Sequence, residues 1–385
     1  LGLLALFEQA GEISALAETS PPSLIAQYRL LLAITHRAIS QAQGRWTDAE
    51  RVLWYQSGLP LAAIREYLQR WRERFWLFHP QYPFMQVAAL GDAEETRDKL
   101  KPWTQISLAS ANGNAPVVFD HSCDLVPRSI SAADALRTLL GFLQFTPGGL
   151  VKTLRDSDKA GALANTAAVM PVGDSLAQSL CLALHPPTQT GHDDLPAWER
   201  NTLSITQLRG DPEMASGPND RYTRQSRAVL LLADDEQRVQ WIRFAAGLAL
   251  GDDVQAPDPM ASYRAGSNSM VRLSFSEGRA LWRDLPALLP DAEGKASQPA
   301  AVLEWAANLQ FYLGGGVQPL LIAGLASDQA KLLRWRSERI ALPAKLLASV
   351  DHANELRRYV RDAEELFTAL RKLATGMLAE TLPDP

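Results

Sequence analysis

Cysteine is nearly absent from this chain. Its 385 residues include only Cys123 and Cys181, and no CxxC pair occurs. A zinc site built from four thiolates is therefore excluded, and a framework of disulfides is not expected. This cysteine usage is typical of proteins of the reducing cytosol, so the sequence predicts a cytoplasmic location.

Long apolar runs are also missing. No apolar stretch reaches the roughly 18 residues needed to cross a membrane, and no signal peptide is visible at the start of the chain. We therefore expect no membrane partner. The chain begins with Leu1 instead of Met, inside an expected short amphipathic helix over residues 1–18. We therefore expect the natural N-terminus, and any targeting segment with it, to be missing.

The chain has no excess of basic charge. It carries 38 Lys and Arg residues against 43 Asp and Glu residues, a formal net charge of -5. This balance argues against a protein that holds nucleic acid by bulk charge alone. It leaves room for a local basic patch.

The composition that remains is that of an ordinary globular protein. Hydrophobic residues make up 46% of the chain, which supplies a core, and a chain of 385 residues usually forms two domains. Helical patterns fill the N-terminal part, strand patterns appear from about residue 200, and the sequence after Pro343 is purely helical. The expected fold class is therefore α+β, with a boundary at Pro343.

Several local patterns predict single elements. Ile64, Leu68, Trp71 and Phe75 follow the spacing of one buried helix face, and Ser131 is a good N-cap for the helix that contains AADALRTLLGFLQF. The stretch RAVLLLADDEQRVQWIRFAAGLAL predicts a strand, an acidic turn and a second strand, and VQPLLIAGLA predicts another strand.

The stretch FWLFHPQYPFMQ, residues 75–86, has two interpretations. His79 could mark a chemical site, but no second ligand lies at helical spacing from it. The prolines at 80 and 83 disfavour helix and stiffen the chain, and Phe84 and Met85 supply apolar bulk to bury. We therefore interpret the stretch as a structural corner, with His79 capping or buried.

Two polar stretches are candidates for metal or nucleophile chemistry. FDHSCD places Asp120, His121, Cys123 and Asp124 close together, and GHDD contains His192. A metal-dependent nuclease or phosphohydrolase could use His121, Asp120 and Asp124, with His192 as a further ligand. The alternative is that both stretches are polar loops, because catalytic Cys and His residues normally come from distant parts of a chain. We expect no metal and no other cofactor.

Two glycine turns and one basic stretch are candidates for binding. Neither TPGGL (146–150) nor LGGG (313–316) is followed by Lys-Ser/Thr, so neither is a phosphate loop. LGGG fits a helix C-cap, whereas the glycines of TPGGL could also let the backbone approach a ligand closely. The stretch DQAKLLRWRSER interleaves basic residues with Trp335, which suits either phosphate and stacking contacts or a solvated charged face.

A series of motifs then points to a family. Single motifs are weak, but their order and spacing are specific over nearly the whole chain. In order they are FHPQYPFMQ, NAPVVFDHS, FLQFTPGG, RYTRQSRAVLL, DPMASYR with EGRALWRDLPALL, and GLASDQAKLLRWRSER. This series resembles the large-subunit (CasA) family of Cascade, the type I-E CRISPR surveillance complex.

The resemblance implies an architecture. It implies an N-terminal mixed α/β globular domain, here residues 1–342, followed by a C-terminal helical region of the four-helix-bundle type, here residues 343–385. Compared with the family, the chain lacks a short strand before residue 1. It also lacks a cysteine-rich insertion before RYTRQSR, and it ends after the first helix of the bundle.

The resemblance also implies three elements that read the PAM, a short duplex sequence beside the target. The first is a loop that contacts the 5′ end of the guide RNA and tethers the subunit, the second is a glycine loop against the minor groove, and the third is a wedge hairpin that starts strand separation, with phosphate contacts just beyond it. The corresponding residues here are Val118, Phe119 and Asp120 for the first, Pro147, Gly148 and Gly149 for the second, Asp328, Gln329 and Ala330 for the third, and Lys331 and Arg334 for the phosphates.

The function implied is recognition without catalysis. The protein would recognise the PAM in double-stranded target DNA, promote duplex opening and R-loop formation, and help recruit the helicase–nuclease of the system. Its partners would be the other Cascade protein subunits, the guide RNA and the target DNA. Two alternatives remain open, namely the metal-dependent nuclease or phosphohydrolase described above and a purely structural scaffold subunit.

Overall fold

The computed structural model describes residues 1–110, 120, 124–187, 193–251, 257–276, 278–328 and 331–382, with the side chains of 326–334 left out. Its α-helices are α1 Leu3–Glu8, α2 Pro21–Gln43, α3 Asp48–Ser57, α4 Leu61–Arg70, α5 Ala132–Phe145, α6 Leu176–Ala183, α7 Ile205–Leu208, α8 Pro218–Thr223, α9 Ala301–Tyr312, α10 Ala344–Ala348 and α11 Val350–Thr381. Its strands are β1 Lys101–Pro102, β2 Ile130–Ser131, β3 Gly149–Thr153, β4 Arg155–Asp158, β5 Ala167–Pro171, β6 Arg227–Ala233, β7 Arg238–Ala246, β8 Tyr263–Ala265, β9 Met270–Arg272, β10 Ser297–Gln298, β11 Val317–Asp328 and β12 Lys331–Pro343.

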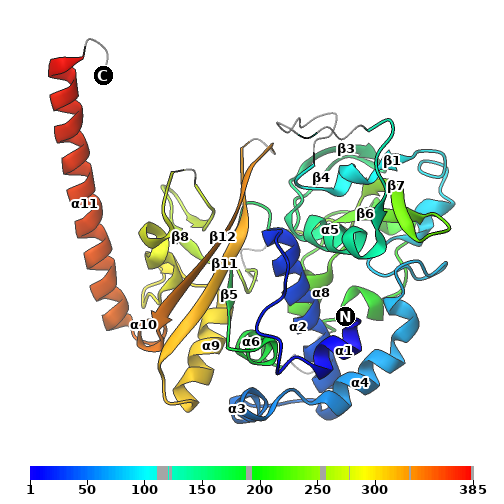
Figure 1. Cartoon of the computed structure of the whole chain (residues 1–385), viewed down its shortest axis with the longest axis horizontal. Coiled ribbons are helices and arrows are strands. Elements are labelled where there is room, and N and C mark those ends of the chain that lie inside the picture. Colours follow the sequence, from blue (N-terminus) through cyan, green and yellow to red (C-terminus); the bar gives the residue numbers. More distant parts are fainter. Residues whose placement is uncertain are drawn as a thin grey trace.

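Helix α2 is the centre of the globular body. It begins after Ser20, whose hydroxyl accepts the backbone N–H of Ser23, and prolines occupy its first two positions. Nearly every side chain from Pro21 to Ile39 is buried, because α2 packs against α4, α5, α6, α8 and β11. Because it is covered on nearly all sides, α2 lies inside the protein, with a few polar side chains such as Arg29 and His36 buried along it. Figure 1 shows the other elements arranged around it.

Two of the sheets are built around β7 and β11, and β3 and β4 form a separate two-stranded sheet. In one, β7 is the central strand and pairs with β1, β2 and β6, all antiparallel. This confirms the predicted strand, acidic turn and strand. In the other, β11 pairs antiparallel with β12 on one side and with β5 on the other. The predicted strand VQPLLIAGLA is therefore confirmed as most of β11.

The β11–β12 hairpin is much longer than its neighbour β5. Its pairing runs from Val317↔Pro343 to Asp328↔Lys331, whereas β5 stops pairing at Gly324. Gly324 lies directly against the carbonyl of Thr166, where a Cβ would clash. Beyond this point the hairpin continues for four residues of β11 as two strands, which is about 13 Å at 3.3 Å per residue. The outer end of the hairpin therefore projects from the sheet (Figure 1).

The N-terminal helices are shorter than expected. Helix α1 covers only Leu3–Glu8 of the expected 1–18, because the carbonyls of Ala10 and Ile13 accept hydrogen bonds from the start of α6, at Ala177 and Leu176. The helix expected through Phe75 ends at Arg70 and continues as a 3-10 turn, η1 (Arg72–Phe75). The predicted face still packs on the core.

The corner interpretation of residues 75–86 is confirmed. His79 Nδ1 accepts the backbone N–H groups of Gln81 and Tyr82, at 3.2 and 3.0 Å. Phe84 is buried, and its ring lies 5.3 Å from that of Phe75. His79 therefore holds a turn that returns the chain to the core.

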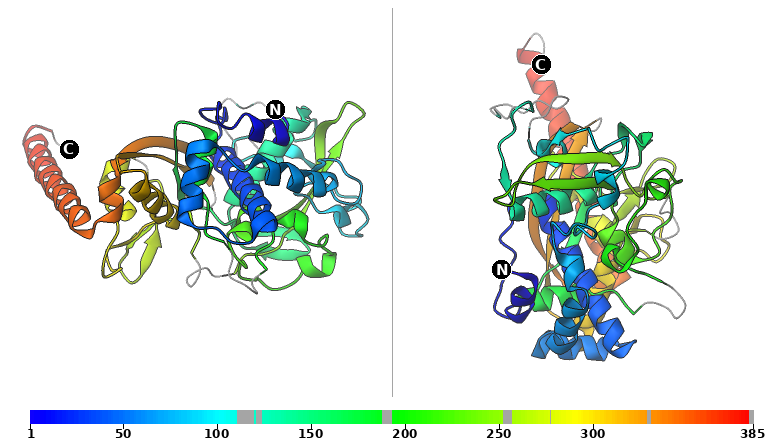
Figure 2. Two further views of the ribbon diagram at one scale, coloured as in Figure 1. Left: turned by 90° about the horizontal axis from the view of Figure 1, so that it is seen from below. Right: turned by 90° about the vertical axis from the view of Figure 1, so that its right-hand side faces the viewer.

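The C-terminal part is helical, as expected. Strand β12 ends at Pro343, and α10 and α11 follow. Figures 1 and 2 show α11 extending away from the globular body, with its first turns beside the rest of the chain. From Tyr359 onward it carries exposed apolar residues at helical spacing: Tyr359, Leu366, Phe367, Leu370, Leu373, Met377 and Leu378. Within the described residues, no helix combines the length and apolarity of a membrane span.

A stacked pair of histidines lies in the core between α2 and the segment after α6. The rings of His36 and His185 are 3.6 Å apart and nearly parallel. His36 is fully used, because Nε2 bonds the carbonyl of Pro186 and Nδ1 bonds the side-chain amide of Asn219. Neither ring nitrogen of His185 has a hydrogen-bond partner in the described part of the chain. Burial lowers the pKa of His36 to about 3 and holds the pKa of His185 well below its usual range.

This pair predicts acid destabilisation. In the unfolded chain both histidines titrate near 6.5, so as the pH falls below that value the unfolded state gains protons that the folded state does not. The free energy of unfolding should decrease down to about pH 3, by up to about 1.4 kcal/mol per pH unit for each histidine. Buried Asp194, whose pKa is raised by burial, works in the opposite direction. Urea unfolding from pH 8 to pH 4 measures the slope.

The variant His185→Phe isolates this effect. It keeps an aromatic ring in the stack and removes one of the two titrating groups, so its unfolding free energy should depend less steeply on pH. The exposed His352 supplies a comparison substitution, His352→Gln, measured under the same conditions. Equal slopes for His185→Phe and the native chain would contradict the assignment.

Candidate nucleic-acid interface

Only some of the predicted binding residues lie in the part of the chain that the structure describes. Pro147, Gly148 and Gly149 connect α5 to β3 and are described in full. The backbone of Asp328 closes β11, and those of Lys331 and Arg334 belong to β12. Asp120 is half-buried. Val118, Phe119, Gln329 and Ala330 lie outside the described residues.

The two described elements reach the same end of the molecule. In Figure 1 the β3–β4 hairpin and the outer end of the β11–β12 hairpin both lie at the top, and the right-hand view of Figure 2 keeps both there. They come from parts of the chain separated by more than 150 residues. The fold therefore presents the β3–β4 hairpin, where the glycine loop begins, and the outer end of the β11–β12 hairpin at one end of the molecule.

The glycine loop begins at a firmly held helix end. Helix α5 starts at Ser131, whose hydroxyl accepts the N–H of Asp134, which confirms the predicted cap. It ends at Phe145, and the N–H of Thr146 closes the last turn on Phe142. The carbonyl of Thr146 then accepts the N–H of Gly161 at 2.8 Å. The two ends of the β3–β4 segment are thus joined where the loop leaves the core.

A buried arginine holds the loop from behind. Arg227, the first residue of β6, donates from Nη2 to the carbonyl of Pro147 at 2.6 Å and from Nη1 to the carbonyl of Lys159 at 2.7 Å. The same Nη1 lies 3.2 Å from a carboxylate oxygen of Asp158. One guanidinium therefore fixes both sides of the hairpin base. Burial lowers the pKa of Arg227, and the neighbouring Asp158 opposes that shift.

Asp158 is the charge that makes this arrangement possible. Its side chain is fully buried, and it also accepts a hydrogen bond from Arg155 at 2.7 Å and one from the backbone N–H of Gly247 at 2.8 Å. Arg155 continues to the carbonyls of Gly210 and Gly247. Two arginines and the backbone amide that follows β7 thus compensate one buried carboxylate, as a buried charge requires.

The glycines of the loop are required by the loop itself. A Cβ on Gly148 would lie 3.2 Å from the backbone N of Ala160 and 3.3 Å from the carbonyl of Asp158. Gly149 has a φ of +139°, a conformation that other residues rarely adopt. Both glycines are exposed. Their bare backbone is therefore available to a ligand. The backbone conformation of the loop already requires glycine at both positions, whether or not a ligand binds.

The motif RYTRQSR proves to be structural. Its three arginines, Arg221, Arg224 and Arg227, are all buried. Arg224 pairs with Asp220 at 2.7 Å and also donates to the carbonyls of Glu213 and Ala249. The sequence interpretation missed the Arg227–Asp158–Arg155 group, because its members are scattered along the chain. The only signal was the regular spacing of the three arginines.

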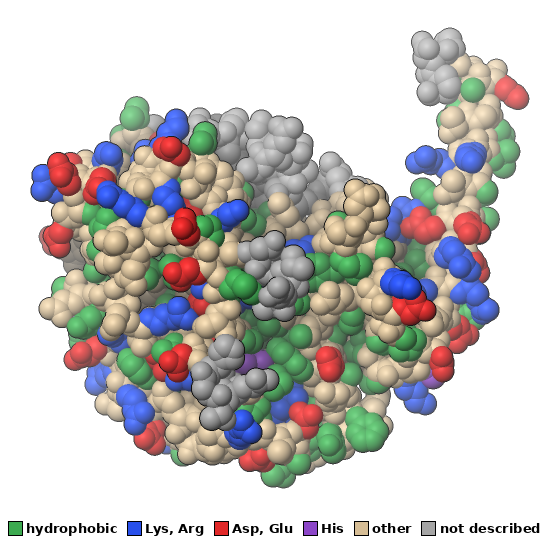
Figure 3. All heavy atoms as spheres, turned by 180° about the vertical axis from the view of Figure 1, so that it is seen from behind, with side chains coloured by type: hydrophobic (Ala, Val, Ile, Leu, Met, Phe, Trp, Pro, Cys, Tyr) green, Lys and Arg blue, Asp and Glu red, His purple; other side chains and the backbone are tan. Residues whose placement is uncertain are grey.

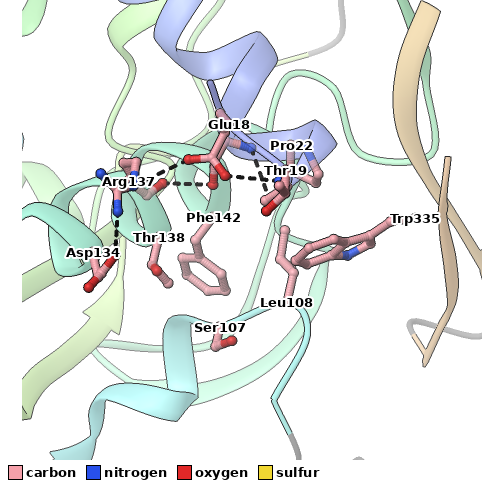
Figure 4. Close-up of a pocket in the computed structure, with 13 residues that line it drawn as sticks. Glu18, Thr19, Pro22, Ser107, Leu108, Asp134, Arg137, Thr138, Phe142 and Trp335 are labelled. Carbon is pink, nitrogen blue, oxygen red and sulfur yellow. Dashed lines mark hydrogen bonds and ion pairs between the residues drawn. The ribbon is translucent and has the colours of Figure 1, made fainter. Parts of the chain in front are cut away.

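A cavity lies at the root of the β11–β12 hairpin, between it and helices α2 and α5. Its volume is about 220 Å³, and Figure 4 shows Trp335 of β12 facing Leu108 and Phe142 across it. On the other side of β12, Arg336 donates to the carbonyl of Arg279 at 2.8 Å and covers the ring of Phe275. Of the basic residues in DQAKLLRWRSER, Arg336 therefore serves the fold.

Most of the candidate metal ligands lie outside the described residues, so the structure shows no cluster of them. His121, Cys123 and His192 lie outside the described residues, and Asp124 accepts a hydrogen bond from Thr104 at 3.0 Å. In the part of the chain that the structure describes, no three His, Cys, Asp or Glu side chains are placed to hold a metal ion.

Figure 3 shows acidic and basic side chains interspersed over the visible face.

Comparison with known proteins identifies the family. Residues 1–385 match the family described as CRISPR-associated protein Cse1. The chain belongs to the CRISPR-associated Cse1 family. A curated relative, the CRISPR-associated protein CasA/Cse1 of Thermus thermophilus, is 36% identical over an alignment of 378 residues, and the match covers 95% of this chain and 72% of the relative.

Solved structures of Cse1 proteins share the fold. The structure of Thermus thermophilus CasA (Cse1) matches with a TM-score of 0.83 and 32% identity, covering 97% of this chain and 78% of that one. A chain in a structure described as a CRISPR RNA-guided surveillance complex matches with a TM-score of 0.81 and 26% identity, covering 100% and 80%. The mixed helix-and-sheet fold predicted from the sequence is thereby confirmed for this Cse1 family member.

The Arg227 contacts predict a large loss of stability in Arg227→Met. The variant leaves Asp158 buried with one cation fewer and removes the donor from the carbonyls of Pro147 and Lys159, so the free energy of unfolding should fall by about 3 kcal/mol. Urea unfolding measures it. The surface pair Arg65–Glu8 provides the control, because its side chains are 58% and 40% exposed. Arg65→Met should cost less than about 1 kcal/mol, and an equal loss in both variants would contradict the role given to Arg227.

Proposed function

We propose that this chain is the large, non-catalytic subunit of an RNA-guided CRISPR surveillance complex that recognises the PAM in double-stranded target DNA. The observation that carries the proposal is that an exposed glycine loop and the outer end of a long two-stranded hairpin both lie at one end of the molecule (Figure 1). Membership in the Cse1 family and the match to a chain of a CRISPR RNA-guided surveillance complex support it.

In this proposal the glycine loop reads the minor groove. Pro147, Gly148 and Gly149 present backbone without side chains, which can lie flat against base edges in a groove about 6 Å wide. Because Arg227 and Asp158 fix the loop before DNA arrives, little ordering cost would be added on binding.

The hairpin supplies the opening step. Asp328, Gln329 and Ala330 at its end insert beside the PAM, at an unstacking cost of a few kcal/mol per step that the new contacts offset. Lys331 and Arg334 then contact phosphates. Pairing between guide and target reads the remaining sequence, a division of labour known from other RNA-guided proteins.

The remaining contacts are with the complex itself. The loop that contains Val118, Phe119 and Asp120 contacts the 5′ end of the guide RNA and tethers the chain to the other protein subunits. Residues 343–385 begin a helical region, and the exposed apolar residues of α11 fit a helix with a further apolar partner. The assembled subunit also helps recruit the helicase–nuclease.

The test is duplex binding by the complex assembled from this chain, the other subunits and guide RNA. Targets with the PAM and with a scrambled PAM are compared for the native chain, Gly149→Asp and Gln329→Ala. A side chain on Gly149 meets open space, so it should block the groove and remove PAM discrimination. Gln329→Ala should bind the PAM but slow strand opening, followed with a fluorescent base beside the PAM.

Gly316 provides a matched control. It has a φ of +130° and open space around its Cβ position, like Gly149, but it lies at the other end of the hairpin, before β11. Gly316→Asp therefore carries the same backbone penalty without touching the proposed interface, and it should bind and open DNA like the native chain. If Gly149→Asp and Gln329→Ala also behave like the native chain, the subunit is a scaffold.

A further inference from the structure

Leu150 is an exposed leucine in an unusual place. It follows the two glycines directly as the second residue of β3, and it is 77% exposed. Single exposed leucines are common and need no explanation by themselves. What sets Leu150 apart is that the backbone on both sides of it is held rigidly.

The hairpin around Leu150 is anchored at both ends. At its base, Leu150 pairs with Ser157, next to Asp158 and the Arg227 contacts. At its turn, Leu154 packs into a small apolar cluster formed by η2 (Ala88–Gly91), β6 and β7, and Arg155 bonds the carbonyls of Gly210 and Gly247. The apolar side chain is therefore presented in a fixed position instead of moving with a free loop.

Charged residues flank Leu150 on the exposed side of the hairpin. Lys152 and Lys159 are both exposed, and Asp156 is exposed on the opposite strand. Val151, between Leu150 and Lys152, is half-buried. The pairing of β3 with β4 shifts register between Leu150 and Thr153, and Lys152 has a φ of +62°, so the two exposed side chains lie two positions apart on an irregular stretch of β3. An apolar side chain with cations beside it suits a duplex, because proteins that bind the minor groove insert apolar residues between base steps and neutralise phosphates nearby.

We propose that Leu150 is an apolar contact with the target duplex at the PAM and that Lys152 neutralises the adjacent phosphate. The inference rests on the proposed function and adds to it two side chains of β3, next to the glycine backbone that begins the same hairpin. Leu150 packs against or between base edges, and Lys152 holds the duplex against it without regard to sequence.

Binding by the assembled complex at several salt concentrations tests the two roles separately. Leu150→Asn keeps the side-chain size but removes its apolar character, so it should bind the PAM duplex about tenfold more weakly with an unchanged salt dependence. Lys152→Ala should weaken PAM and scrambled duplexes alike and reduce the slope of log K against log salt by about 1. Asp156→Asn should strengthen both.

The matched control is Leu53→Asn, at another exposed leucine, 58% exposed, on α3 at the opposite end of the molecule (Figure 1). It should bind DNA like the native chain. Native-like binding by Leu150→Asn, while Gly149→Asp still loses discrimination, would overturn this inference and leave the proposed function standing. If Gly149→Asp and Gln329→Ala are native-like too, the proposed function itself fails. A Leu150→Asn chain that no longer assembles with the other subunits in the absence of DNA would assign Leu150 to a protein contact and overturn the inference as well.

Discussion

The pairing of Arg227 with Asp158 is the constraint on which the proposed interface depends. A buried carboxylate is stable only when opposite charge and hydrogen-bond donors surround it, and here two arginines and a backbone amide do so. The spare donors of Arg227 reach the carbonyls of Pro147 and Lys159. The arginine that compensates the buried charge of Asp158 therefore also sets the position of an exposed loop.

The β11–β12 hairpin illustrates a different source of rigidity. In its inner half, β11 lies between β5 and β12, and the approach of Gly324 to the backbone at Thr166 leaves no room for a shift in register. Trp335 packs against the core and Arg336 donates to the carbonyl of Arg279, at the point where the hairpin becomes two-stranded. In the proposed role the hairpin must not bend where it leaves the sheet, and these contacts lie at that point.

Sequence patterns predicted the elements whose cause is local. The N-cap at Ser131, the β6–β7 hairpin and the turn at His79 follow from neighbours in the chain. Sequence patterns failed where contacts with a distant segment determine the structure. Hydrogen bonds to α6 end α1 early, and the hydrogen bond from Arg227 to Pro147 spans 80 residues. For the candidate site, motifs located the glycine loop and the hairpin but gave no sign of what fixes them.

Several of the arginines counted in the composition are buried, so they add no positive charge to the surface. Arg29 forms a fully buried pair with Asp258 at 2.6 Å, and the other arginines buried among the described residues are Arg51, Arg221, Arg224 and Arg227. These cations hold the core together and are not available to phosphates. Aspartates are buried with them, Asp158, Asp220 and Asp258 as their direct partners, so the burial of arginine leaves the balance of charge on the surface little changed. With a formal net charge of -5, a chain of this kind attracts DNA poorly by itself. Recognition in the proposed role therefore depends on a few rigid contacts at one end and on the charge of neighbouring subunits.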